Sequence, residues 1–229
     1  MASQTNKTHQ TEQTTRLSRE LIASTAIALV DREGPDALSM RRLAAEVGFA
    51  TMSLYTYVAS RQELLAVIAD RLYREVDMST VPGERWDDTM RRSIASYREV
   101  ALRHPDVYLL VAGDYPLSPD LAERVVAVQS EQGVPLLWTR RISAFLHAFL
   151  AGFLAAEIRR AKRESADGVG DEAVEAMTSY TEQTFREDLE LVIAAAAQLA
   201  PADADWRTPP DAPTHGVPAA SQPSDDEPA

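Results

Sequence analysis

Hydroxyl, aromatic and guanidinium side chains gather between residues 39 and 61, where their hydrogen-bonding groups could bind an anionic polymer. Hydroxyls and arginines donate to phosphate oxygens, and a guanidinium can also grip two acceptors on the edge of a base. Side chains of both kinds are therefore typical of surfaces that bind nucleic acid. The candidates are Ser39, Arg41, Thr51, Met52, Ser53, Tyr55, Thr56, Tyr57 and Arg61.

Two short helices joined by a tight turn would bring these side chains to one surface. Ser39 can cap the first helix, whose apolar residues Leu43 and Val47 are four apart. Gly48 ends that helix, because glycine adopts the left-handed conformation without steric cost. The second helix, 50–57, would then offer its first residues to the major groove, as in a helix-turn-helix.

The same pattern also fits an ordinary helical hairpin whose polar face is simply solvated. Serine, threonine and tyrosine are common on such faces, and a motif this short has a real false-positive rate. The spacing alone leaves both interpretations open.

The wider sequence resembles the N-terminal domain of the tetracycline-repressor (TetR) family of transcriptional regulators. The matching segments within residues 17–73 are LIASTAIALVDREG, LSMRRLAAEVG and SLYTYVASRQELL. The resemblance implies that Arg41 binds a guanine edge and that Thr51, Met52 and Tyr55 face bases. It implies phosphate contacts for Ser39, Ser53, Thr56, Tyr57 and Arg61; Arg61 stands where family members often have a lysine.

Helix caps and breaks along the chain predict an all-α protein, with an N-terminal three-helix helix-turn-helix domain and a larger helical ligand-binding and dimerisation domain. Ser18 caps a first helix that ends at Gly34, and Ser60 opens a fourth helix reaching about Asp77. Later helices are expected over 86–103, 118–133, 135–163 and 171–200, with an ambiguous apolar piece at 106–112. The predicted divisions are a disordered arm 1–15, a DNA-binding domain 16–78, a ligand-binding and dimerisation domain 79–200 and a disordered acidic tail 201–229.

Two late helices have features of an interface between helices. Apolar residues of the last one recur every three or four positions, and small residues of the preceding one permit close backbone approach. LHAFLAGFLAAE and FREDLELVIAA resemble the dimerising helices of the TetR-type C-terminal domain, which form a four-helix bundle. The interface candidates are Ala148, Gly152, Ala155, Phe185, Leu189, Val192 and Ala196. Core packing within one chain is the alternative for any of them.

The resemblance further implies a cavity among the middle helices for a small-molecule effector. Such a cavity would be lined by apolar and aromatic side chains with few polar groups. The candidates are Trp86, Tyr97, Tyr108, Trp138, Phe145, His147, Phe149 and Phe153. Each could equally belong to the core. The four histidines are scattered and cysteine is absent, so neither a metal site nor a cofactor is expected.

The distribution of charge is compatible with DNA binding, although the 229-residue chain carries a net charge of −12. Residues 1–61 hold seven basic and six acidic side chains, so the acidity belongs to the remainder. Attraction to phosphates would come from a local patch. The N-terminal residues lack the apolar run of a signal peptide, and the apolar run 144–156 is too short to span a bilayer. A cytoplasmic protein that does not bind membranes is expected.

These patterns predict a homodimeric, ligand-responsive transcriptional repressor that binds a palindromic double-stranded operator and is released by an effector. Two alternatives belong to other classes. An all-α enzyme would need a base–nucleophile pair or metal ligands at suitable spacing, and the sequence shows neither. A helical adaptor that binds only protein would leave the cluster of Arg41, Tyr55 and Tyr57 unexplained.

Overall fold

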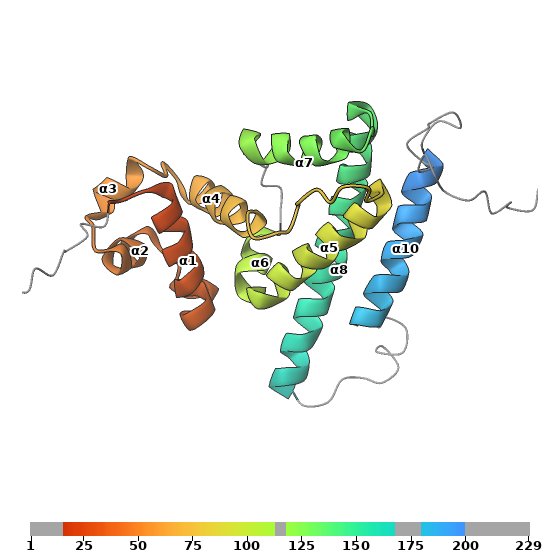
Figure 1. The fold of residues 1–229 in the computed structure, drawn as a ribbon. Coiled ribbons are helices and arrows are strands. Elements are labelled where there is room, and N and C mark those ends of the chain that lie inside the picture. Colours follow the sequence, from red (N-terminus) through yellow and green to blue (C-terminus); the bar gives the residue numbers. More distant parts are fainter. Residues whose placement is uncertain (1–15, 113–117, 168–179, 200–229) are drawn as a thin grey trace, which may run out of the picture.

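The computed structural model describes residues 16–112, 118–167 and 180–199, and these residues form helices and no strand. The all-α prediction is confirmed. Figure 1 shows a small N-terminal group of helices beside a larger group built around the long helix α8. The predicted N-terminal arm and acidic tail lie outside the described residues.

The N-terminal group consists of α1 (Arg19–Glu33), a 3-10 turn (Pro35–Ala37), α2 (Met40–Val47), α3 (Thr51–Tyr55) and α4 (Arg61–Tyr73). As predicted, Ser18 caps α1, where its hydroxyl accepts from the backbone N–H of Leu21 at 3.1 Å. Ile22 and Leu29 of α1 and Ile68 of α4 are fully buried in a common core. That core also includes residues of α5 and α6, so the boundary between the two groups is not a gap in packing.

Helix α4 ends at Tyr73, four residues earlier than the sequence predicted. The N–H groups of Glu75 and Val76 donate to carbonyls only three residues back, in tight turns instead of α-helical bonds. The N–H of Asp77 then donates to the Ser96 hydroxyl at 2.9 Å, which ties the chain to α5.

The C-terminal group consists of α5 (Trp86–Arg103), α6 (Pro105–Val111), α7 (Pro119–Glu131), α8 (Leu136–Asp167) and α10 (Glu182–Leu199). The ambiguous piece at 106–112 is thus helix α6. Leu154 and Ile158 of α8 pack with Phe185 and Leu189 of α10 in a second core. By length and composition α8 could cross a membrane, but we interpret it as a core helix because one side of it is buried against its neighbours.

The predicted end of α8 near Arg163 was wrong. Helix α8 continues to Asp167, past the loop expected from Ser165. Helix α10 begins at Glu182, because Thr181 and Thr184 cap its first turn reciprocally, with N–H to hydroxyl distances of 3.2 and 2.8 Å. The predicted start at Asp171, with the apolar positions Val174 and Met177, lies outside the described residues.

Candidate nucleic-acid interface and ligand cavity

Helices α2 and α3 form the predicted helix-turn-helix. The Ser39 hydroxyl accepts from the N–H of Arg42 at 3.2 Å and caps α2. Gly48 ends α2 with φ of 81° and ψ of 27°, in the left-handed region that glycine alone enters freely. Its N–H donates to the Ala44 carbonyl at 3.0 Å. Leu43, Ala44 and Leu54 are buried, which fixes α3 against α2.

Burial of Leu54 turns the other residues of α3 outward. Met52 is 75% exposed and Tyr55 is 41% exposed. Thr51 and Ser53 are half-buried beside them, and Thr56 follows on the surface. The structure therefore brings the predicted base-facing residues to one exposed edge, although their contacts with DNA remain predictions.

The two neighbouring arginines of α2 have different surroundings. Arg42 pairs with Glu33 at 2.8 Å and with Glu46 at 3.4 Å. Arg41 is exposed and has no ion pair within the described parts of the chain. Its guanidinium is therefore available for a base edge, whereas that of Arg42 is already engaged.

Arg61 has a structural contact that the sequence did not indicate. Its Nη1 donates to the Leu38 carbonyl at 2.8 Å and so joins the start of α4 to the segment before α2. Similarly, Nε of Arg19 donates to the Tyr57 carbonyl at 2.9 Å. The phosphate contact predicted for Arg61 would have to use its other N–H groups.

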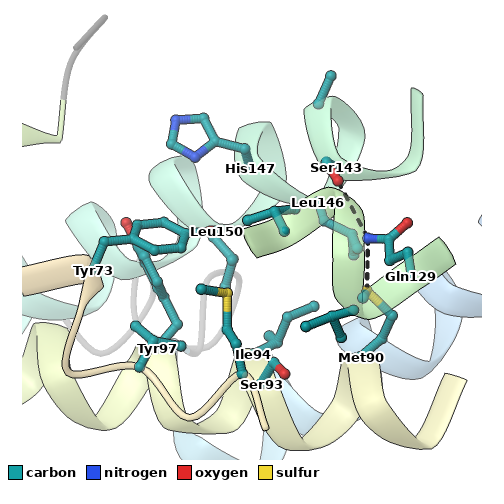
Figure 2. A pocket seen from close by; sticks show the side chains of 15 residues that line it. Tyr73, Met90, Ser93, Ile94, Tyr97, Gln129, Ser143, Leu146, His147 and Leu150 are labelled. Atoms are coloured by element: carbon teal, nitrogen blue, oxygen red, sulfur yellow. Dashed lines mark hydrogen bonds between the residues drawn. The ribbon is translucent and has the colours of Figure 1, made fainter. Parts of the chain in front are cut away.

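A cavity of about 320 Å³ lies among the end of α4, α5, α7 and α8. Two predicted residues line it: Tyr97, on the wall, and His147, which is exposed at the rim (Figure 2). Tyr73, Met90, Ser93 and Gln129 also line the cavity and were not predicted. Of these residues, only Gln129 could have been suspected from the sequence, because it is a polar residue on the apolar side of α7. In the structure it is 3% exposed.

The other predicted pocket residues do not line this cavity. Trp86 and Tyr108 are buried core residues, and the Tyr108 hydroxyl donates to the Leu150 carbonyl at 3.4 Å. Phe149 packs against Phe153 and Phe185 with ring centroids 5.7 and 6.0 Å apart. The remaining two are Trp138, whose ring lies under the Arg141 guanidinium, and Phe145, which is 42% exposed.

Packing within the chain accounts for several of the predicted interface residues. Phe185, Leu189 and Ala196 are buried in the second core, and Val192 is half-buried against it. Ala155 is also buried, at 8% exposed. For these the alternative interpretation, intramolecular packing, describes the single chain. Ala148 and Gly152 of α8 are exposed, as is Leu191 of α10 at 69%.

The fold and the exposed α3 define a protein with an N-terminal helix-turn-helix domain joined to a larger helical domain that contains a cavity. The sequence profile of the bacterial regulatory proteins of the tetR family matches residues 22–68. The N-terminal domain of this chain is therefore a domain of the tetR family of bacterial regulatory proteins.

Three similar proteins illustrate the relationship. The transcriptional repressor DrrR1 of Streptomyces coeruleorubidus is 38% identical over 94 residues, which cover 39% of this chain and 33% of DrrR1. The class D tetracycline repressor protein of Escherichia coli is 31% identical over 125 residues, 53% of this chain and 57% of the repressor. ActR of Streptomyces coelicolor, solved in complex with (S)-DNPA, matches the fold with a TM-score of 0.66 and 26% identity over 81% of this chain and all of ActR.

The sequence matches to these curated relatives span only a third to somewhat over half of their lengths. The family model matches residues 22–68, within the N-terminal helix-turn-helix domain, whereas the structural match to ActR covers 81% of this chain.

Proposed function

We propose that the protein is a transcriptional repressor that binds a palindromic operator as a homodimer and is released by a small-molecule effector. The observation that carries this proposal is the exposure of Met52 and Tyr55 on a short helix whose other side is anchored by buried Leu54. A helix held in this way can enter the major groove without rearrangement.

Several features support the parts of the proposal. DrrR1 and the tetracycline repressor are named as repressors, and ActR has been solved with (S)-DNPA and with actinorhodin. The cavity reaches the end of α4. An effector bound there would therefore touch the helix that connects the cavity to the N-terminal helix-turn-helix domain, which we call the reading domain. BioQ, solved with its double-stranded DNA operator, shares the fold at 22% identity.

A homodimer is supported by the exposed apolar and small residues of α8 and α10. Ala148 and Gly152 lie on the open side of α8, and Leu191 lies on the open side of α10. A second copy could cover both in an isologous contact. The two helix-turn-helix domains of such a dimer, related by a twofold axis, would match half-sites one helical turn, about 34 Å, apart.

The experiment is a mobility-shift assay on DNA from upstream of the gene and its neighbours. Arg41→Ala should weaken specific binding by about 1–3 kcal/mol, the range for a bidentate contact with guanine. Arg42→Ala is the matched control: it removes the same charge one residue away, but from a guanidinium already paired with Glu33 and Glu46. Its effect should be clearly smaller. Absence of any specific complex, or equal losses in the two variants, would contradict the proposal.

A further inference from the structure

Apart from His147, which is exposed at the rim, the walls of the cavity among α4, α5, α7 and α8 hold no cationic or carboxylate side chain. Methyl, methylene and aromatic groups provide most of the surface, and its described lining contains no Lys, Arg, Asp or Glu. The lining includes Tyr73, Tyr97, Met90, Ser93, Gln129 and Ser143. A carboxylate, phosphate or ammonium group placed here would lose its hydration with no opposite charge in return, at a cost of several kcal/mol.

Aromatic rings form one end of the cavity. Tyr73 and Tyr97 meet edge to face with centroids 5.3 Å apart (Figure 2). Outside the lining, Tyr97 also meets Tyr108 edge to face at 6.2 Å. Burial raises the pKa of Tyr108 to about 12 and also raises the pKa values of Tyr73 and Tyr97. All three phenols are therefore neutral at physiological pH, and the rings of Tyr73 and Tyr97, which line the cavity, can pack against another flat ring.

The other end has a small set of polar groups. Nε2 of Gln129 donates to the Ser143 hydroxyl at 3.3 Å and approaches Sδ of Met90 at 3.9 Å, which fixes the amide. Oγ of Ser93, on α5, is buried and has no hydrogen-bond partner within the described residues. A buried hydroxyl without a partner is uncommon because its desolvation is uncompensated. The hydroxyl of this lining residue therefore keeps an unused donor and acceptor.

We propose that this cavity binds an uncharged, flat aromatic molecule whose hydroxyl or carbonyl group is hydrogen-bonded by Ser93, with its rings against Tyr73 and Tyr97. Its volume is at the lower end of the range for small-molecule sites, which corresponds to about two or three fused rings. This inference rests on the proposed function, because it names the chemical class of the effector.

Three phenanthrene probes that differ in one substituent test this assignment. Equilibrium dialysis of the full-length protein against 9-phenanthrol, phenanthrene and phenanthrene-9-carboxylate gives three affinities, read from the fluorescence of each probe. We expect 9-phenanthrol to bind most tightly and the carboxylate to bind at least about 100-fold more weakly, because its charge would be buried without a partner. Binding of the carboxylate as tight as that of 9-phenanthrol would overturn the proposal, and so would failure of all three probes to bind.

Variants at Ser93 test the position of the polar group. Ser93→Ala should weaken 9-phenanthrol about 3- to 10-fold, the range for one hydrogen bond, and leave phenanthrene unchanged. Ser93→Thr retains a hydroxyl and should restore much of the loss, whereas Ser24→Ala, on the distant helix α1, is the matched control. Equal loss for both probes in Ser93→Ala would contradict the assignment of Ser93.

The dialysis uses no DNA, so the two proposals can fail separately. Binding of 9-phenanthrol by a protein that forms no specific DNA complex would refute the repressor function and leave the chemistry of the cavity standing. A specific DNA complex with no probe binding would do the opposite.

Discussion

The ion pair between Arg98 of α5 and Glu157 of α8 allows a quantitative prediction about stability. Nη2 and Nε of Arg98 donate to the two carboxylate oxygens of Glu157 at 2.5 and 3.1 Å. The two side chains are only 14% and 12% exposed, and the guanidinium also lies 5.2 Å from the centre of the Phe185 ring of α10. The pair therefore joins three helices in a place that water hardly reaches.

Replacing Arg98 by methionine keeps most of the packing volume but leaves the Glu157 carboxylate buried without its partner. Loss of one member of a buried pair costs about 3–5 kcal/mol, a large part of the roughly 5–15 kcal/mol that stabilises a typical domain. With a slope near the upper end of about 1–3 kcal/mol per molar urea, the midpoint of unfolding should fall by roughly 1.5 M.

Urea unfolding followed by circular dichroism measures this change, with two further variants for comparison. Arg98→Met combined with Glu157→Met should recover at least half of the loss, because well-packed apolar side chains often replace a buried pair without cost. Arg186→Met on α10 breaks a pair whose members are 74% and 58% exposed, and should cost no more than about 0.5 kcal/mol. A loss in Arg98→Met as small as that of Arg186→Met would refute the reasoning.

Three further predictions follow from single sites. Gly48→Ala should destabilise the protein by about 1–2 kcal/mol in urea unfolding, because φ is 81° there, and an unchanged midpoint would contradict this. Hydrogen bonds from Arg92 lower the pKa of Glu84 below its usual 4.5. The stabilisation of the folded protein by this pair is therefore present above pH 4.5 and is lost as the pH falls through the lowered pKa. Arg92→Gln should flatten the decline of the urea midpoint between about pH 5 and pH 3. Gly152→Leu should weaken the proposed dimer in sedimentation velocity, whereas Gly152→Ala should have little effect. A Cβ atom at position 152 would meet nothing within the chain, so either variant should leave the fold of the monomer intact. Equal dimerisation of the two variants would place Gly152 outside the interface.

Local sequence signals predicted the reading domain well because they act over a few residues. A hydroxyl that accepts from the backbone N–H three residues later, as at Ser18, Ser39 and Ser60, specifies a helix start without reference to the rest of the fold. A glycine in the left-handed region, as at Gly48, specifies a helix end in the same way. Helix starts, the turn and the exposed side of α3 therefore followed from the sequence.

The cavity could not be predicted in the same way, because apolar periodicity shows that a side is buried and not what covers it. Phe149 and Tyr97 both lie on apolar sides of helices, yet Phe149 faces the rings of α10 while Tyr97 faces the cavity. The same ambiguity applies to Phe185 and Leu189, which pack within the chain. Ser93 and Gln129 become informative only when α5 and α7 are placed together.

On the proposed function, α4 limits how strongly an effector can act on DNA binding. Its 13 residues extend over roughly 20 Å, from the contact of Arg61 with Leu38 to Tyr73 at the cavity. Because Leu64 and Ile68 are buried in the core of the reading domain, a displacement of α4 at the cavity would turn that domain as a unit instead of bending the helix. Tight binding of an effector is not sufficient for release, however. A ligand that binds equally well in both positions of α4 does not change their populations. The effector must therefore bind one position of Tyr73 more tightly than the other, and the difference in binding free energy must equal the free energy needed to release the operator.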